Sequence, residues 1–383
     1  MRQHSSYSLL YIFISIIMTC VIIGLLFIYS SSSIYAFERL GSSDYYLRKQ
    51  LIGLVLGGVA LLILRFLPLP FIKRISPWVF CATMALTVLT FIPGIGQSVH
   101  GSHRWISFAG FGFQPSEALK MSFIVYLSYL LAKKQYKVSS FTQGYLPLMS
   151  IVGVTSLLLL KQPDFGQAVT LCLTAFLLFF VAQCQTKHLV LTLSSIVPLM
   201  GILIYMKPYR IRRVLTFLNP WDDPHGSGFQ IIQSLIAIGS GNITGVGIAQ
   251  SKQKFFYLPM QHTDFIFSII AEETGFIGSF LLVSLFILFL YTGLKIATTL
   301  RDPFSYYVTT GYVLLITIQT LLNICVASGL LPTKGLALPF ISYGNSGLLC
   351  NIGMIGIIIN CVYSNEEHIH NSRVIATNKE HYS

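Results

Sequence analysis

The chain contains the stretch Leu258-Pro-Met-Gln-His-Thr-Asp264-Phe-Ile-Phe-Ser-Ile-Ile-Ala-Glu-Glu273, which joins a polar loop to the apolar run 265–292. Because about 20 apolar residues suffice to cross a bilayer, this run predicts a membrane-spanning helix. Asp264 stands at the entrance of that helix. A carboxylate at a membrane boundary is unfavourable unless a partner or a reaction uses it. Asp264 is therefore the first functional candidate.

The composition indicates that the whole chain, and not only this segment, belongs to a membrane protein. Of its 383 residues, 54% are hydrophobic and 10% are charged, whereas a soluble protein carries about 25% charged residues. The apolar runs are long and do not alternate, so they predict helices and not a barrel. The net charge of +12 is scattered among short loops. This pattern indicates contact with anionic lipid and no nucleic acid.

We predict an all-α, polytopic membrane protein with about ten transmembrane helices. The apolar segments are 9–30, 49–66, 76–93, 117–132, 144–160, 166–183, 187–206, 265–292, 304–328 and 338–363. The first is taken as a span and not as a signal peptide. The prediction is a single domain, 1–383, with a large extracytoplasmic loop, 207–264, between helices 7 and 8 and a polar cytoplasmic tail, 364–383. Short loops on the side of the termini carry more Lys and Arg, so both termini are expected in the cytoplasm.

Four segments that carry motifs then share the outer face: 101–117, 161–166, 207–264 and 329–346. That shared location favours one site built from all four. The seven cysteines lie in or beside apolar runs without CxxC spacing, which predicts neither a disulfide nor a zinc site.

The first outer motif, Arg104-Trp105-Ile106, precedes Phe113-Gln-Pro-Ser-Glu117. Proline followed by an acid in the first turn predicts the start of a helix. Arg104 is either an interfacial anchor or a substrate ligand. Lys120 lies at i+3 from Glu117, so the two pair on one face of the helix. Lys120 alternatively faces a cavity and holds a phosphate.

The second motif is Lys161-Gln-Pro-Asp164-Phe-Gly166. Asp164 after a proline is typical of a turn. The alternative is that its carboxylate reaches into the outer site.

The loop 207–264 combines cations with glycines. Arg210 and Arg213 share a helical face, Gln230 to Ile238 predicts a short helix half sunk in the membrane surface, and Lys252 follows a glycine-rich stretch. Glycine N–H groups and cations together suit a phosphate or pyrophosphate ligand. The alternative is a loop that is basic because it meets lipid headgroups.

Asp264 is expected to act alone. On a helix that includes it, Ser268, Ala271 and Gly275 form a small-residue face, and about 12 Å of rise separates it from Glu272. This spacing favours one base over a pair of carboxylates. The alternative for Glu272 and Glu273 is a buried structural pair with a Lys or Arg.

The last motif runs from Gly329 to Gly347 and includes Pro332, Lys334, Pro339 and Ser342. Its prolines and glycines predict a re-entrant or broken helix, which membranes tolerate only where it lines protein or water.

These motifs together resemble the SEDS family, which includes FtsW, RodA and SpoVE. The resemblance rests on SxRW-I, Phe-Gln-Pro-Ser-Glu, Gln-Pro-Asp-x-Gly, Asn-Pro-Trp, His-Thr-Asp-Phe-Ile-Phe, Ala-Glu-Glu and Leu-Pro-Phe-Ile-Ser-Tyr-Gly, and it covers essentially the whole chain. One departure is Asn345, where the family usually has glycine. Asn tolerates positive φ, so the turn is expected to survive.

The resemblance implies an inverting peptidoglycan glycosyltransferase that polymerises lipid II at the outer face of the bacterial cytoplasmic membrane. It implies Asp264 as catalytic residue, undecaprenyl pyrophosphate as leaving group, and a class B penicillin-binding protein with other divisome membrane proteins as partners. Lys334 in Pro-Thr-Lys-Gly-Leu favours the division branch of the family. Two alternatives stay open: a lipid II flippase and a scaffold without chemistry.

The candidate site residues follow from the motifs and from the family resemblance. The expected substrate-binding set is Arg104, Lys120, Arg210, Arg213, Lys252 and Ser342. The expected supporting set is Glu117, Asp164, Glu272 and Lys334. No metal site is assigned because no acidic cluster marks one, although the reaction leaves room for an assisting divalent cation.

Overall fold

The computed structural model describes residues 2–99, 102–108, 111–133, 139–206, 211, 216–224, 226, 228–254, 259, 261–333 and 335–381.

Within these residues, each of the ten predicted apolar segments corresponds to one long helix. The helices are α1 (Arg2–Leu40), α2 (Tyr45–Phe66), α3 (Leu69–Leu89), α4 (Pro115–Lys133), α5 (Leu146–Lys161), α6 (Phe165–Val181), α7 (Thr186–Tyr205), α10 (Ile266–Thr299), α11 (Pro303–Ala327) and α12 (Asn345–His381). A π-helical turn, Phe141–Tyr145, leads into α5. The predicted start of α4 is confirmed, because the helix begins at Pro115.

Seven helices in the described part are long and apolar enough to cross a membrane. The apolar helix α6 is shorter, with 17 residues. Large apolar side chains remain exposed on the outside of the bundle: Val55 on α2 and Phe280 on α10 are 66% and 60% exposed. Such surfaces are favourable only against lipid. The chain is therefore a multi-pass, all-α membrane protein, as predicted.

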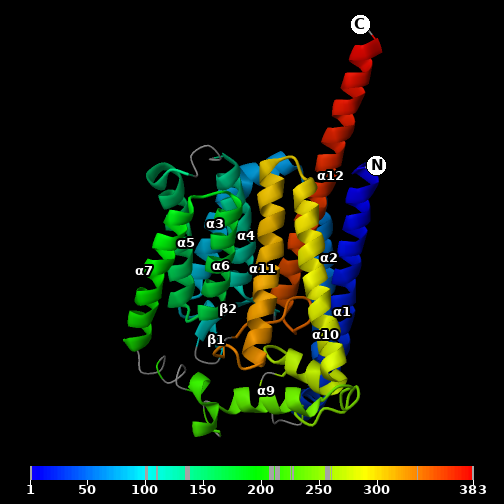
Figure 1. Cartoon of the computed structure of the whole chain (residues 1–383). Coiled ribbons are helices and arrows are strands. Elements are labelled where there is room, and N and C mark those ends of the chain that lie inside the picture. Colours follow the sequence, from blue (N-terminus) through cyan, green and yellow to red (C-terminus); the bar gives the residue numbers. More distant parts are fainter. Residues whose placement is uncertain are drawn as a thin grey trace.

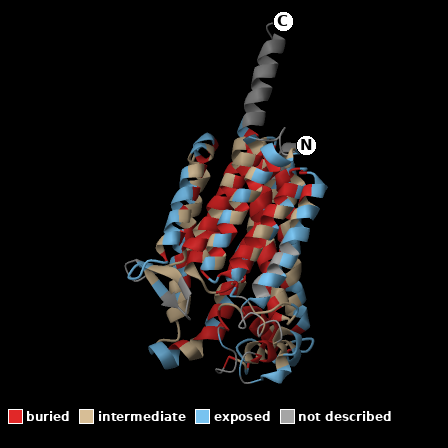
Figure 2. Ribbon diagram, turned by 90° about the vertical axis from the view of Figure 1, so that its left-hand side faces the viewer, coloured by how far each residue is buried: buried red, intermediate tan, exposed pale blue. Residues whose placement is uncertain are grey.

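The bundle has two different ends (Figure 1). α1 begins and α12 finishes at one end. The other end carries a small sheet and the helix α9 (Phe229–Ser240), which lies across the helix axes. The most buried helices are α11 and α12, and burial in Figure 2 is concentrated along the middle of the bundle. The outer motifs are thus gathered at the end opposite the two termini.

The sheet is a feature that the all-α prediction missed. Strands β1 (Gly96–Val99), β2 (Ser102–Phe108) and β3 (Phe111–Phe113) are antiparallel in the order β1-β2-β3. Gly96 is paired with Ile106, and Ile106 with Phe113. β1 and β3 are very short, and β2 does not alternate polar and apolar residues, so the sequence gives no strand pattern to recognise. The sheet places Arg104 in the middle of β2.

The short helix expected from Gln230 to Ile238 is present as α9. Ser234 fixes it to the bundle, since its hydroxyl donates to the carbonyl of Ala327 at 2.6 Å and lies 2.6 Å from the hydroxyl of Ser268. Ile231 and Ile232 are buried, whereas Ile236 is exposed. The helix therefore has one face on the protein and one face outward.

The predicted span 265–292 is present as α10, but the helix is broken within it. Gly275 interrupts α10 with φ 67° and ψ −161°, a conformation that glycine reaches without a side-chain clash. Asp264 also lies before the first helical residue, Ile266. The small-residue helical face predicted from Asp264 through Ser268 to Gly275 is therefore not formed. The helix begins after Asp264 and is broken at Gly275.

The predicted broken segment near Gly329 is confirmed as irregular backbone between α11 and α12. Leu336, Leu338 and Ile341 within it are buried. Asn345 is the first residue of α12 and does not have a positive φ. The left-handed conformation that asparagine tolerates is therefore not used at this position.

Candidate functional site

Asp264 lies at the sheet-bearing end of the bundle and is partly exposed. Its backbone is fixed by Asn323 of α11, whose Nδ2 donates to the carbonyl oxygens of Asp264 at 2.8 Å and of Leu336 at 2.6 Å. A Cβ added to Gly335 would stand 3.5 Å from Oδ2 of Asp264. The irregular segment before α12 thus forms a wall beside the carboxylate.

Ser342 fixes the residue before Asp264. Its hydroxyl donates to the carbonyl of Thr263 at 2.5 Å and accepts from the N–H of Leu338 at 2.8 Å. The side chain is buried. Its hydroxyl is therefore used within the protein, and the structure gives Ser342 a role in positioning Asp264 and not an exposed binding group.

An aromatic cluster adjoins this wall. The ring of His262 lies 4.5 Å from that of Tyr46 and 5.8 Å from that of Tyr343. Burial lowers the pKa of His262 to about 4, so its imidazole is neutral at pH 7. Nδ1 of His262 is buried without a hydrogen-bond partner in the described structure.

Arg104 and Asp164 lie close enough to Asp264 for their charges to act on it. Nη1 of Arg104 lies 3.8 Å from Oδ1 of Asp164, and Nε donates to the carbonyl of Gln162 at 3.0 Å. Asp164 also accepts from the N–H of Gln167 at 3.4 Å, so it caps α6. The turn reading of Asp164 is confirmed, because the residue caps α6, and its buried carboxylate is paired with Arg104.

Glu117 and Lys120 form the predicted i,i+3 ion pair, with 3.2 Å between Nζ and Oε2. Lys120 is 1% exposed and donates to Oε1 of Gln319 at 2.9 Å. Gln167 donates to Glu117. Gln319 in turn donates to the carbonyl of Ala337 at 2.9 Å. Lys120 is thus bound by buried protein groups. Because its ammonium is not exposed, the structure does not support the alternative in which Lys120 faces a cavity.

Charge and burial together set the proton affinity of Asp264. Burial raises its pKa to about 7, Arg104 opposes this rise, and Asp164 adds to it. Burial likewise raises the pKa of Asp164, against the effect of Arg104. Among the described residues, neither Glu272 nor Glu273 is a charge that perturbs Asp264. The arrangement leaves one carboxylate with a pKa suited to proton transfer near neutral pH.

Of the remaining predicted residues, some are described by the structure and three are not. Lys252 is exposed, and its backbone N–H is bound by Glu272. Glu273 forms a buried ion pair with Lys254, as the structural alternative expected. Three predicted residues lie outside the described part of the chain: Arg210, Arg213 and Lys334.

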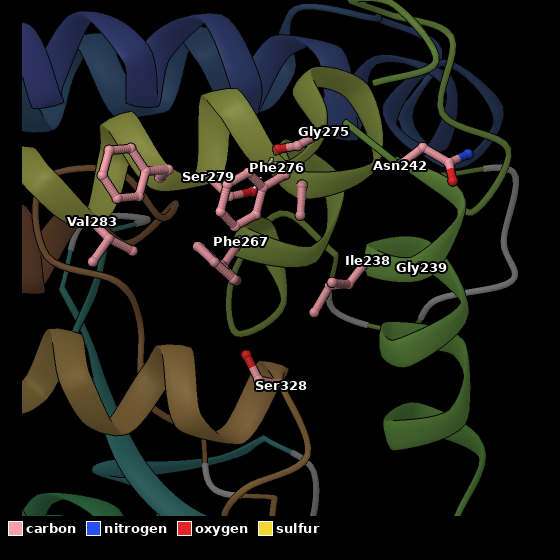
Figure 3. Close-up of a pocket in the computed structure, with 11 residues that line it drawn as sticks. Ile238, Gly239, Asn242, Phe267, Gly275, Phe276, Ser279, Val283 and Ser328 are labelled. Carbon is pink, nitrogen blue, oxygen red and sulfur yellow. Dashed lines mark hydrogen bonds between the residues drawn. The ribbon is translucent and has the colours of Figure 1, made fainter. Parts of the chain in front are cut away.

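A cavity of about 450 Å³ opens between α9, α10 and the end of α11 (Figure 3). It is lined mainly by apolar side chains, among them Ile238, Phe267 and Phe276, with Asn242 and Ser328 at its margin. Phe267 follows Asp264 by three residues. Asp264 itself is not among the residues that line this cavity.

Within the described ranges, no group of three or more His, Cys, Asp and Glu residues is placed to hold a metal ion. The carboxylate of Asp164 is bound by Arg104 and by the N–H of Gln167, and that of Glu117 is paired with Lys120.

Several site residues escaped the sequence reasoning. Gln167, Gln319 and Asn323 are neutral amides inside apolar helices, and the prediction considered mainly charges. A signal was present, because Gln319 and Asn323 lie at i,i+4 on one face of α11. Uncharged polar groups within a span also need partners, so such a pair indicates a buried polar site.

The fold and the site define a multi-pass membrane protein with a polar, carboxylate-containing site at one end of its helix bundle. The chain matches the sequence profile of the FtsW, RodA and SpoVE family, described as cell cycle proteins, over residues 10–367. It belongs to this family.

Similar sequences carry related names. A protein of Geobacter metallireducens named probable peptidoglycan glycosyltransferase FtsW is 39% identical over 360 residues, 94% of this chain and 96% of that protein. Stage V sporulation protein E of Bacillus subtilis is 39% identical over 339 residues, 88% of this chain and 92% of that protein.

Solved structures show the same fold. One, described under structural coordination of polymerization and crosslinking by a peptidoglycan synthase complex, has a TM-score of 0.75 at 26% identity and covers 94% of this chain and 98% of its own. Rod shape determining protein RodA of Thermus thermophilus has a TM-score of 0.66 at 22% identity, covering 92% and 96%. The predicted family and fold are confirmed.

Proposed function

We propose that this chain is a peptidoglycan glycosyltransferase that polymerises lipid II into β-1,4 glycan strands for septal synthesis in cell division. The observation that carries the proposal is Asp264, a carboxylate with a pKa of about 7 held between Arg104, Asp164 and the wall before α12. Relatives named peptidoglycan glycosyltransferase align over 94% of the chain and support the same activity.

Asp264 acts as the general base. Its carboxylate takes the proton of the 4-hydroxyl of the acceptor GlcNAc, and that oxygen attacks the anomeric carbon of the donor MurNAc with inversion. The bond from that carbon to the pyrophosphate breaks, and undecaprenyl pyrophosphate leaves with the bonding electron pair. A base with a pKa near 7 is deprotonated in a useful fraction at neutral pH and still accepts a proton readily.

Cations near the leaving group lower the barrier because negative charge grows on the pyrophosphate. Lys252 is an exposed candidate, and Arg104 lies beside Asp264. Arg210, Arg213 and Lys334 are further candidates from the sequence. Lys120 is not assigned to this role, because its ammonium is buried against Glu117 and Gln319.

The proposed activity leads to an expected orientation of the chain in the membrane and to expected partners. Lipid II polymerisation occurs at the outer face of the bacterial cytoplasmic membrane, so we propose that the sheet-bearing end faces outward and that both termini are cytoplasmic. One similar structure comes from work on a peptidoglycan synthase complex. We propose a class B penicillin-binding protein as transpeptidase partner, together with other divisome membrane proteins.

A flippase needs polar groups along a full crossing path. The buried charges of this cluster end at Lys120, and the following turns of α4 bury Phe123, Leu127 and Leu131, with Ser122 and Ser128 as buried polar residues among them. This uncharged continuation favours chemistry at one end of the bundle over transport through it.

The test is polymerisation of labelled lipid II by the purified chain with its class B penicillin-binding protein. Wild type is compared with Asp264→Asn, which removes the base but keeps the shape, and with Glu38→Gln. Glu38 is an exposed carboxylate near the outer end of α1 and serves as the matched control. We expect strands from wild type and Glu38→Gln and none from Asp264→Asn.

Two outcomes contradict the proposal. Strands of normal yield from Asp264→Asn exclude the base role. No strands from any variant, when formation of the partner complex is demonstrated, favour the flippase or scaffold alternative.

A further inference from the structure

Glu272 and Glu273 are two adjacent carboxylates buried on α10, and neither takes part in the proposed proton transfer. Their exposed fractions are 2% and 1%. A buried carboxylate is costly unless donors satisfy it. Every donor found for this pair, apart from Ser30 of α1, comes from the segment Ala249–Lys254.

Glu273 binds both the backbone and the side chains of that segment. It accepts from the N–H of Ala249 at 2.9 Å and from the hydroxyl of Ser30 at 2.8 Å, and its Oε1 lies 3.5 Å from Nζ of Lys254. Lys254 is itself 4% exposed and donates to the carbonyl of Ala249. The segment is thereby joined to α10 and to α1 at once.

The backbone of Ala249 has a rare conformation that these contacts hold in place. Its φ of 63° lies in the left-handed region, which is unfavourable for a residue with a Cβ. Its N–H is held by Glu273 and its carbonyl by Lys254. Backbone in a rare conformation persists only where its surroundings determine it, and such positions are concentrated at functional sites.

Glu272 binds Ser251 and Lys252 of the same segment. Its Oε1 accepts from the N–H of Lys252 at 2.9 Å, and its Oε2 accepts from the hydroxyl of Ser251. Within the described structure, no cation lies within ion-pair distance of Glu272. The Lys252 ammonium is exposed and has no hydrogen bond or ion pair to a described residue. Glu272 therefore fixes the backbone from which a free cation projects.

The break in α10 completes the attachment. Phe276 N–H donates to the carbonyl of Asn242 at 2.8 Å, and Val246 N–H donates to the carbonyl of Glu272 at 3.0 Å. A Cβ on Gly275 would stand 2.3 Å from the backbone nitrogen of Gly245. Figure 3 shows Gly275 beside the turn that carries Asn242. The loop and the interrupted helix therefore interlock through their backbones.

The same segment is tied to the residues before Asp264. Nε2 of Gln261 donates to the carbonyl of Lys254 at 3.1 Å and to that of Ser31 at 2.7 Å. Gln261 is 3% exposed and precedes Asp264 by three residues. A chain of direct contacts thus runs from the glutamates through Lys254 to Gln261, three residues before the proposed base.

We propose that Glu272 and Glu273 are positioning residues that hold Ala249–Lys254 rigidly and so place the Lys252 cation to bind the pyrophosphate of the lipid substrate. This inference rests on the proposed glycosyltransferase function. Its specific content is that Glu272 acts through Lys252. A cation whose backbone is already fixed loses less entropy on binding a phosphate group than one on a mobile loop.

The experiment is a double-mutant cycle in the full chain with its partner transpeptidase, reading the apparent KM and kcat for lipid II. Lys252→Ala is expected to raise KM about tenfold, the effect of losing one charge-assisted contact. Glu272→Ala is expected to raise KM by a similar factor with kcat nearly unchanged. In the Lys252→Ala background, Glu272→Ala should raise KM no further.

Further variants separate positioning from general stability. Glu272→Gln keeps one carbonyl oxygen to accept from the Lys252 N–H, so it should recover most of the KM of wild type. Ser251→Ala removes only the hydroxyl that Glu272 binds, and it serves if Glu272→Ala does not fold. Ser284→Ala, an exposed hydroxyl bonded within α10, is the control expected to behave as wild type.

The outcomes distinguish this inference from the function on which it rests. Wild-type chain that makes no strands contradicts the proposed function. Active wild type in which Glu272→Ala or Ser251→Ala leaves KM unchanged contradicts the inference alone. Equal multiplication of KM by Glu272→Ala with and without Lys252 also contradicts it, because the glutamate then acts independently of the cation.

Discussion

Arg104 of β2 and Asp164 at the start of α6 form an ion pair of 3.8 Å beside Asp264. The two charges act on Asp264 in opposite directions, since Arg104 lowers its pKa and Asp164 raises it. Burial is the larger influence and brings the pKa to about 7. The pair therefore tunes the proposed base from residues that lie far from it in the sequence.

The pH dependence of polymerisation should report this tuning. The base works when deprotonated, so kcat/KM of wild type should rise with pH through about 7. Arg104→Gln removes a charge that lowers the pKa, and the rise should move to higher pH by about one unit. Asp164→Asn should move it to lower pH. Rates are measured from about pH 5.5 to 9. Profiles that coincide for all three proteins would show that Asp264 is not the titrating group.

The raised pKa of Asp264 also has a cost for stability. Its pKa in the folded protein, about 7, is above the ordinary value of 3.8. Stability is therefore greatest below the lower value and declines as pH rises through the higher one, because the folded state holds the proton more tightly. Asp264→Asn removes this decline.

We expect the Tm of Asp264→Asn to exceed that of wild type by a margin that widens between about pH 4 and 8. Because Asp264 is partly exposed, the expected gain is on the order of 1 kcal/mol. Thermal unfolding of both proteins in the same detergent measures it, with Glu38→Gln as control. A constant difference across this range would mean that the aspartate is not destabilised by burial.

The ion pair of Glu117 and Lys120 predicts a different pattern. Both side chains are almost fully buried, and each has an amide partner, Gln167 or Gln319. Lys120→Met leaves a buried carboxylate unpaired and should destabilise the protein by about 3–5 kcal/mol. The double variant Glu117→Gln, Lys120→Met removes both charges and should recover much of that loss. Thermal unfolding measures the loss of stability in each variant. Additive losses in the double variant would mean that the two charges do not depend on each other.

Much of the fold could be predicted because long apolar runs have one favourable structure in a membrane. The start of α4 at Pro115 followed from proline and dipole chemistry, and the irregular backbone before α12 from its prolines and glycines. The break at Gly275 was missed, since one glycine in an apolar run gives no local sign that a distant loop residue, Gly245, will pack against it.

The site was predictable to a similar extent. Asp264 was selected as a candidate because a charge stands out against an apolar run, and the structure brings the charges of Arg104 and Asp164 close enough to act on it. Ser342 was assigned to substrate from its motif, yet its hydroxyl binds Thr263. Whether a polar side chain faces a ligand or its own protein depends on tertiary contacts, and no spacing in a sequence encodes that choice.

The contact between Gly275 and Gly245 gives the last prediction. Gly275 has φ 67°, and a Cβ there would lie 2.3 Å from the nitrogen of Gly245, a backbone atom that cannot rotate away. Gly275→Ala should cost at least about 1–2 kcal/mol in backbone strain, before the clash itself is counted. Gly58→Ala in α2 is the matched control, because nothing lies within 4 Å of its added Cβ.

The effect of Gly275→Ala should appear first in the loop, because the loop is what packs against the helix break. Digestion with a lysine-specific protease should cut after Lys252 or Lys254 faster in Gly275→Ala than in wild type, whereas Gly58→Ala should resemble wild type. Lys254 is the more informative site, since its ammonium is buried against Glu273 in the intact structure. Equal cleavage in all three proteins would show that the interlock at Gly275 does not hold the loop, and that the glutamates alone must do so.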